Sequence, residues 1–171
     1  MNKNIVLIGM PGSGKTTIGK EVAKRLQIPF IDMDEMIEKK EGKVISEIFD
    51  YGEEHFRNLE TNCAKELSNR KLCVISTGGG IVKRKENIEL LKINSIIVFI
   101  NRSPEKIVSD VDIQKRPLLK NGIENVYKIY NERIDLYKKY CDLEILNDDT
   151  IESAVNKIVN SINKREIFYE Y

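Results

Sequence analysis

Glycine is the residue that most constrains the fold of this chain, because six of its ten glycines fall in two short segments. The first segment holds Gly9, Gly12 and Gly14, and the second holds Gly78, Gly79 and Gly80. Each segment directly follows an apolar, β-branched run, residues 4–8 and residues 72–76, of a kind typical of strands buried on both faces of a parallel sheet. Because ligands bind at the carboxyl ends of strands in open α/β sheets, we expect both segments to lie in a binding site.

Helical patterns alternate with these apolar runs. Apolar spacing predicts helices over residues 15–26, 53–69, 126–140 and 151–162, and one that opens at Ser103-Pro104-Glu105. Two further strands are predicted at residues 96–100 and 143–146. The alternation predicts a three-layer α/β fold with a parallel sheet. The length falls within the range of about 100–200 residues for one domain, so we expect a single domain over residues 1–171.

Residues 9–16 match the phosphate-loop pattern GxxxxGK[ST] without a mismatch, between a predicted strand and a predicted helix. Glycines let the backbone turn its N–H groups around phosphate oxygens, and the following helix adds its positive end. Lys15 is expected to reach the β- and γ-phosphates, and the Thr16 hydroxyl to ligate Mg²⁺. The chain has no Asn-Lys-x-Asp guanine signature, which disfavours GTP. The predicted nucleotide-binding residues are Gly12, Ser13, Gly14, Lys15, Thr16 and Thr17.

Composition and charge exclude several classes of function. Twenty-eight Lys and Arg against 27 Asp and Glu give a net charge of +1, so no nucleic-acid partner is expected. The longest apolar runs fall far short of the ~20 residues that cross a bilayer, so no membrane partner is expected. Cys63, Cys73 and Cys141 contain no CxxC pair and favour reduced thiols in a cytoplasmic protein. The single His55 argues against a histidine-based metal centre.

Two pairs of charged residues are candidates for contact with a second substrate. Asp32 and Asp34 lie two residues apart at the end of the expected second strand, where one can orient Mg²⁺ through water and the other can accept a hydroxyl proton. Taken alone, such aspartates are more often N-caps of a helix. Arg57 and Glu60 lie at i, i+3 on one helix, so Glu60 can aim Arg57 at an anion. Such a pair is more often a solvated helix face.

Residues 109–123 interrupt the alternation of strands and helices. The segment is polar, is limited by Pro117 and contains the turn signal Asn121-Gly122. We interpret it as a mobile loop over the active site, while a plain surface connection fits the composition equally well.

Read together, these motifs closely resemble the shikimate kinase family. Their order and approximate spacing agree from residue 4 to about residue 162. The motifs are residues 9–16, Asp32-x-Asp34, Phe56-Arg57-x-x-Glu60, Thr77-Gly78-Gly79-Gly80, Arg116-Pro117-Leu118-Leu119 and Arg133 within Tyr130-x-x-Arg133-x-x-x-Tyr137.

The resemblance implies a fold and an activity. The fold would be the P-loop fold of nucleoside monophosphate kinases, with five parallel strands in the order 2-3-1-4-5 flanked by helices. Residues 33–61 would form the shikimate-binding subdomain, residues 110–123 a lid and residues 147–150 the adenine loop. The activity would be ATP-dependent phosphorylation of the 3-hydroxyl of shikimate, giving shikimate 3-phosphate and ADP for aromatic amino acid biosynthesis. The enzyme would be a monomer that uses Mg²⁺.

The resemblance also implies how shikimate would be held. Asp34 would hold the substrate hydroxyls, including the one that is phosphorylated, and Arg57 with Arg133 would clamp the carboxylate. Gly79 and Gly80 would present backbone N–H groups to the substrate. Shikimate has its carboxylate at one end and its hydroxyls at the other, so two guanidiniums opposite an acceptor-only carboxylate would discriminate its orientation.

On the phosphate side, the resemblance implies that Asp32 would help Thr16 to position Mg²⁺. Lys15 and the lid-borne Arg116 would supply positive charge to the transferred phosphoryl group and, with Asp34, would be the catalytic residues. Closure of the lid would expel water that otherwise competes as acceptor.

The adenine contact is where this chain departs from the family. Similar enzymes often carry an arginine shortly before the lid arginine, stacked on adenine, whereas this chain has Ser109 and Asp110 there. Arg102 is a possible substitute, although an arginine at a strand end is more often a surface residue.

Two alternative functions remain open from the sequence. The first is a related P-loop kinase of small molecules, such as a gluconate kinase, and the expected clamp of Arg57 and Arg133 disfavours it. The second is a module that binds ATP without turnover, which the presence of Lys15, Asp34 and Arg116 disfavours.

Overall fold

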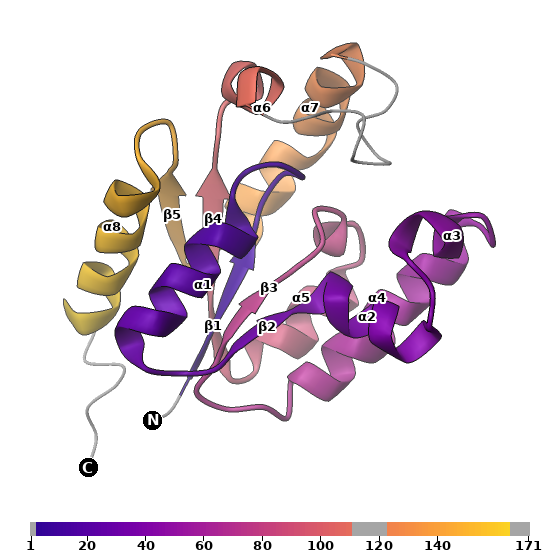
Figure 1. The fold of residues 1–171 in the computed structure, drawn as a ribbon, viewed down its shortest axis with the longest axis horizontal. Coiled ribbons are helices and arrows are strands. Elements are labelled where there is room, and N and C mark those ends of the chain that lie inside the picture. Colours follow the sequence, from indigo (N-terminus) through magenta and orange to yellow (C-terminus); the bar gives the residue numbers. More distant parts are fainter. Residues whose placement is uncertain (1–2, 111–122, 165–171) are drawn as a thin grey trace.

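The computed structural model describes residues 3–110 and 123–164 and places five strands in one parallel sheet (Figure 1). The strand order is β2-β3-β1-β4-β5, which confirms the predicted order and the α/β fold class. The strands are β1 (Asn4–Ile8), β2 (Phe30–Asp32), β3 (Val74–Ser76), β4 (Ser95–Asn101) and β5 (Leu143–Leu146).

Helices connect these strands and cover both faces of the sheet (Figure 1). They are α1 (Lys15–Leu26), α2 (Met33–Glu41), α3 (Ile45–Phe49), α4 (Glu53–Leu67), the 3-10 helix η1 (Ile81–Lys83), α5 (Lys85–Lys92), α6 (Pro104–Asp110), α7 (Ile123–Tyr140) and α8 (Ile151–Lys164). Apolar periodicity does not predict α3 and α5, because five and eight residues make too few turns for a clear stripe.

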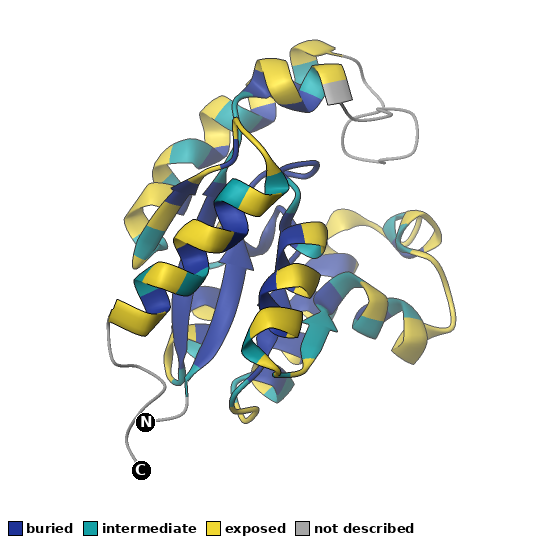
Figure 2. Ribbon diagram, turned by 60° about the vertical axis from the view of Figure 1, so that its left-hand side comes forward, coloured by how far each residue is buried: buried dark blue, intermediate teal, exposed yellow. Residues whose placement is uncertain are grey.

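The central strand β1 sends its side chains alternately into two apolar cores. Ile5 and Leu7 pack with residues of α1 and α8, whereas Val6 and Ile8 pack with residues of α4, α5 and α7. Figure 2 shows the central strands β1, β3 and β4 in dark blue, as buried residues, between helices whose outer faces are exposed. This arrangement confirms the predicted three layers.

Parallel pairing brings the carboxyl ends of the strands to one edge of the sheet. Leu7 of β1 pairs with Ser76 of β3, and Ser76 pairs with Asp32 of β2. The segments that follow these three strands therefore leave the sheet side by side. Both glycine segments lie at this edge, as the sequence predicts.

The loop before β3 is held by a buried asparagine. Asn4 Nδ2 donates to the Arg70 carbonyl oxygen at 2.8 Å, and Asn4 Oδ1 accepts from the Cys73 N–H at 3.2 Å. Leu72, in this loop, has a φ of 55°, which lies in the left-handed region and is incompatible with a strand. For this reason β3 begins at Val74, later than the run over residues 72–76 suggested.

Within residues 3–110 and 123–164, no helix is both long enough and apolar enough to cross a membrane. Residues 111–122 of the expected lid, with Arg116 among them, lie outside the described residues, as do residues 165–171.

We expect Asn4→Ala to lower the free energy of unfolding by about 1–3 kcal/mol, because the Arg70 carbonyl and the Cys73 N–H lose their partner. Urea unfolding followed by circular dichroism measures this change. Asn69→Ala is the matched control, since Asn69 is exposed and its side-chain amide donates to the Lys65 carbonyl at 3.1 Å. Equal losses in the two variants would contradict the role given to Asn4.

Candidate active site

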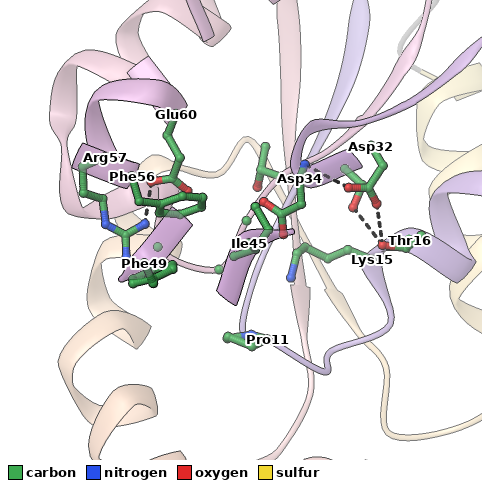
Figure 3. Close-up of a pocket in the computed structure, with 15 residues that line it drawn as sticks. Pro11, Lys15, Thr16, Asp32, Asp34, Ile45, Phe49, Phe56, Arg57 and Glu60 are labelled. Carbon is green, nitrogen blue, oxygen red and sulfur yellow. Dashed lines mark hydrogen bonds and ion pairs between the residues drawn. The ribbon is translucent and has the colours of Figure 1, made fainter. Parts of the chain in front are cut away.

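A cavity opens at the carboxyl ends of β1, β2 and β3, between the phosphate loop, the start of α2, α3, α4 and the glycines after β3 (Figure 3). We call this space the acceptor cavity. Figure 3 places Arg57 and Glu60 on one side of it, Lys15 and Thr16 on the other, and Asp34 between them. A second cavity is lined by the phosphate loop and the first residues of α1. Lys15 and Thr16 line both cavities, so the two spaces adjoin.

The phosphate loop connects β1 to α1 in conformations that glycine adopts readily. Gly12 and Gly14 have φ values of 84° and 91°, which residues with a side chain rarely adopt. Lys15 is buried, and its Nζ donates to the carbonyl oxygens of Gly9 and Met10 at 2.9 Å and 2.8 Å. The ammonium group is therefore held by neutral acceptors, which charged phosphate oxygens can replace with stronger hydrogen bonds.

Asp32 ends β2 and serves two neighbouring segments. Its Oδ1 accepts from the N–H groups of Asp34 and Glu35 at 3.0 Å and 3.4 Å, so it caps α2. Its Oδ2 accepts from Thr16 Oγ1 at 2.8 Å, and Ser76 Oγ lies 3.4 Å from the same hydroxyl. The N-cap interpretation is therefore correct for Asp32, and the same carboxylate also reaches the phosphate side. Hydroxyl and carboxylate oxygens are ligands that Mg²⁺ prefers.

Asp34 lies in the first turn of α2 and lines the acceptor cavity (Figure 3). Its Oδ1 atom is buried and accepts no hydrogen bond from a described residue. Burial raises the pKa of this carboxyl group to about 7, the charges of Asp32 and Glu60 add to the increase, and Lys15 opposes it. A carboxyl group with this pKa can accept a proton near neutral pH.

Arg57 on α4 is held by two carboxylates. Its Nη1 donates to Glu60 Oε2 at 2.5 Å, and its Nη2 donates to Glu53 Oε1 at 3.0 Å. The Arg57 and Glu60 side chains are only 4% and 0% exposed, so the interpretation as a solvated helix face is wrong. Burial disfavours the guanidinium charge, but Glu60 and Glu53 outweigh that effect and raise the pKa of Arg57. A permanent positive charge therefore lies at the cavity wall.

The glycines after β3 pack against the carboxylates of Glu60 and Asp34 and against Pro11 of the phosphate loop. A Cβ built on Gly78 would lie 2.8 Å from Glu60 Oε1 and 3.0 Å from Asp34 Oδ1. A Cβ built on Gly79 would lie 2.5 Å from Pro11 Cδ in the phosphate loop. Cβ atoms in real proteins essentially never lie this close to other atoms. The glycine segment can therefore approach the carboxylates and the phosphate loop only because it has no side chains.

Arg133 on α7 reaches the same glycine segment. Arg133 Nη1 and Tyr137 Oη both donate to the Gly79 carbonyl oxygen, at 3.0 Å and 2.5 Å. Arg133 is buried and does not itself line the acceptor cavity, whereas Arg57 packs directly on Gly80. The N–H groups of Gly79 and Gly80 donate to no described residue. The two arginines therefore contact adjacent glycines whose N–H groups are available to a ligand.

Some residues of the site carry no motif signal. Phe49 lines the acceptor cavity with its ring centroid 4.6 Å from that of the motif residue Phe56, but Phe49 itself belongs to no motif. Lys83 of η1 donates to Glu53 Oε1 at 2.5 Å, so Glu53 is shared between Lys83 and Arg57. A contact between residues 30 positions apart on different elements leaves no local pattern by which to find it.

Residues 147–150 connect β5 to α8 beside the phosphate loop. Asn147 Nδ2 donates to the Ser13 carbonyl oxygen at 2.8 Å. Asp148 Oδ1 accepts from the Ser103 N–H at 3.0 Å, which places the neighbouring Arg102 near this loop. Arg116, the expected lid arginine, lies outside the described residues.

Comparison with known sequences agrees with the geometry. The family model for shikimate kinase matches residues 11–163. A shikimate kinase from Clostridium botulinum is 51% identical over 158 residues, which cover 92% of this chain and 96% of that protein. A shikimate kinase from Clostridium beijerinckii is 50% identical over 158 residues, covering 92% and 94%.

Comparison with solved structures also finds similarity to shikimate kinases. A shikimate kinase from Acinetobacter baumannii in complex with shikimate is 33% identical, with a TM-score of 0.92 and coverage of 98% of this chain and 96% of that one. A shikimate kinase from Aquifex aeolicus is 35% identical, with a TM-score of 0.83 and coverage of 96% and 98%. A gluconokinase from Sinorhizobium meliloti covers 96% and 93% but, at 14% identity and a TM-score of 0.61, shares the fold alone. Because the family model and these relatives cover most of its length, this chain belongs to the shikimate kinase family.

Proposed function

We propose that this chain transfers the terminal phosphoryl group of ATP to the 3-hydroxyl of shikimate, with the residues of the two adjoining cavities in defined roles. The hydroxyl oxygen forms the new bond to phosphorus, the bond to the bridging oxygen breaks, and ADP leaves while the hydroxyl proton is released. Membership of the shikimate kinase family supports the reaction. The observation that carries the assignment of roles is that Lys15 and Thr16 line both cavities, so donor and acceptor meet there.

The acceptor cavity suits a molecule with a carboxylate at one end and hydroxyls at the other. Arg57 lies at one side and Asp34 nearer the phosphate loop (Figure 3). We assign the substrate carboxylate to Arg57 and Arg133, because guanidiniums form strong paired hydrogen bonds with carboxylates. We assign the substrate hydroxyls to Asp34 and to the N–H groups of Gly79 and Gly80.

Asp34 is the group that we assign to the hydroxyl proton. Its buried, unpartnered Oδ1 can accept a hydrogen bond from the alcohol, and its pKa of about 7 lets it take the proton near neutral pH. Phosphoryl transfer depends mainly on positioning and charge, so orienting the alcohol is the larger part of this role.

The phosphate groups are assigned to the loop before α1. Backbone N–H groups from Gly12 to Thr17 surround the phosphates, and Lys15 exchanges the carbonyl oxygens of Gly9 and Met10 for phosphate oxygens. Arg116 would add charge from the lid over residues 110–123, an assignment that rests on the family motif Arg116-Pro117-Leu118-Leu119.

Mg²⁺ is assigned to Thr16 and Asp32. The hydroxyl and the carboxylate already lie 2.8 Å apart, and two protein oxygens fit an ion that keeps several waters and binds substrate phosphates. When bound, Mg²⁺ neutralises charge on the phosphate oxygens. The chain's own contribution is to hold the Thr16 hydroxyl in place through Asp32.

The remaining assignments concern organisation and location. Residues 33–61 supply much of the acceptor cavity wall, which supports their role as the substrate-binding subdomain. Residues 147–150 connect β5 to α8, and the contact of Asn147 with Ser13 holds this connection beside the phosphate loop, which supports the residues after Asn147 as the adenine loop. The three cysteines are free thiols, which supports a reducing, cytoplasmic environment. We also expect a monomer without nucleic-acid or membrane partners, and light scattering tests the monomer.

A coupled ADP-release assay tests the function. With Mg·ATP, the acceptors are shikimate, quinate, gluconate and a nucleoside monophosphate, and we expect the highest kcat/KM for shikimate. A higher kcat/KM for gluconate would show that gluconate is the phosphoryl acceptor instead of shikimate, in the same type of reaction. Absence of ADP release with every acceptor would indicate the module that binds ATP without turnover.

We expect kcat/KM for shikimate to rise with pH up to about pH 7 and then level off, because Asp34 accepts a proton only in its ionised form and its pKa is about 7. Asp34→Asn should lower kcat by ~10²–10⁴ and remove this rise. Glu35→Gln, an exposed change in the same turn, should keep the profile of the wild type. Near-normal turnover by Asp34→Asn would reject the assignment.

We expect Arg57→Ala to raise the KM for shikimate by about 10–100-fold and to leave the KM for ATP unchanged, because it removes a charged hydrogen bond to the carboxylate. The change also leaves Glu60 buried without its partner. The double variant Arg57→Ala with Glu60→Gln removes that unpaired charge and separates binding from stability. Steady-state kinetics with each substrate varied in turn measures both constants.

Arg84→Ala is the matched control for Arg57→Ala. Arg84 donates to Asn58 Oδ1 at 2.9 Å and Thr61 Oγ1 at 3.1 Å and pairs with Glu54, but it does not line the acceptor cavity. Its loss should lower stability without changing the KM for shikimate. If Arg57→Ala and Arg84→Ala raised this KM equally, the clamp would be refuted.

A further inference from the structure

Asn147, the first residue after β5, joins the edge of the sheet to the phosphate loop. Its side chain is buried, and Nδ2 donates to the Ser13 carbonyl oxygen at 2.8 Å across 134 positions of sequence. Its backbone N–H donates to the Asn101 carbonyl oxygen at 2.8 Å, at the end of β4. The amide is therefore held on a rigid element while it contacts the loop.

This contact controls the direction of a loop N–H group. The Ser13–Gly14 peptide is planar and trans, so its carbonyl and the Gly14 N–H point in opposite directions. With the carbonyl directed at Asn147, the N–H is directed away from Asn147. The Gly14 N–H donates to no described residue, and Gly14 lines the cavity formed by the phosphate loop and the start of α1.

The loop backbone needs such a restraint because the backbone dihedral angles of glycine are only weakly restricted. Gly12 and Gly14 flank this part of the loop with positive φ values, and glycine occupies many backbone conformations at little cost. A Cβ built on Gly14 would lie 3.0 Å from Asn147 Nδ2, so the amide packs directly on the loop backbone. Without the Asn147 amide, rotation of the Ser13–Gly14 peptide would change the direction of the Gly14 N–H.

We propose that Asn147 is a positioning residue for the nucleotide phosphates, which acts by fixing the Ser13–Gly14 peptide so that the Gly14 N–H faces them. The proposal rests on the proposed function only in taking the loop to bind a nucleotide. It separates Asn147 from the role expected for residues 147–150 as a whole, because its side-chain amide is directed at the phosphate loop.

The test compares ligands that use different parts of the nucleotide site. Asn147→Leu removes the hydrogen bond at similar volume, and Asn147→Ala is measured beside it because leucine alters packing. Calorimetry in the presence of Mg²⁺ gives the affinities for ADP, inorganic tripolyphosphate and adenosine, and kinetics gives the KM values for ATP and shikimate. We expect both variants to bind tripolyphosphate and ADP on the order of tenfold more weakly, the effect of one buried hydrogen bond. Adenosine binding and the KM for shikimate should not change.

Asn4→Ala is the matched control, because Asn4 is also buried and also donates to a backbone carbonyl, but at the opposite end of β1. It should lower stability and leave the affinity for tripolyphosphate unchanged. If Asn4→Ala and Asn147→Leu weakened tripolyphosphate binding equally, the effect of Asn147 would come from the overall stability of the protein. That result would overturn the proposal.

Two other results would also overturn it. One is unchanged tripolyphosphate binding in both Asn147 variants, and the other is a loss confined to adenosine, which would make Asn147 a residue of the base site. A different result would refute the proposed function. If the wild-type chain bound tripolyphosphate but released no ADP with shikimate, the shikimate kinase activity would be refuted. The comparison of tripolyphosphate affinities would still decide the role of Asn147.

Discussion

The parallel pairing of β1, β2 and β3 is the constraint on which the whole site depends. Because Leu7, Ser76 and Asp32 are in register, the segments that follow the three strands leave the sheet at one edge. Those segments then approach so closely that a Cβ on Gly79 would lie 2.5 Å from Pro11 Cδ. The acceptor cavity and the phosphate cavity are therefore neighbours because of strand pairing, and no contact within either motif alone would bring them together.

Burial of charge gives the acceptor cavity its chemistry. Asp34 and Glu60 each keep one buried oxygen without a hydrogen bond from a described residue, and both oxygens lie close to Gly78. A buried carboxylate without full compensation is costly, which is why the pKa of Asp34 rises to about 7. Arg57 compensates Glu60, and a substrate carboxylate would add further negative charge beside that pair. Arg133, held on the neighbouring Gly79, would supply a second positive charge to such a ligand under the proposed assignment.

Sequence reasoning succeeded where neighbours along the chain decide the structure and failed where distant contacts do. The phosphate loop at residues 9–16 followed from its glycines between an apolar run and a helical pattern, and the strand order followed from the resemblance to the family. The run over residues 72–76 overestimated β3, because the left-handed conformation of Leu72 belongs to a loop that Asn4 holds from β1. The motif Tyr130-x-x-Arg133-x-x-x-Tyr137 named Tyr137 without a contact, whereas the structure shows that its hydroxyl donates to the Gly79 carbonyl.

The sequence by itself determined the fold class, the phosphate loop and the family, because periodicity, glycine positions and motif spacing are local properties that survive without coordinates. Only the tertiary structure decided that Arg57 and Glu60 are a buried pair and that Asp32 both caps α2 and reaches Thr16. It also decided that Asn147 contacts Ser13. Each of these contacts depends on the distance and burial between separate elements, which side-chain packing sets and which no pattern along the chain encodes.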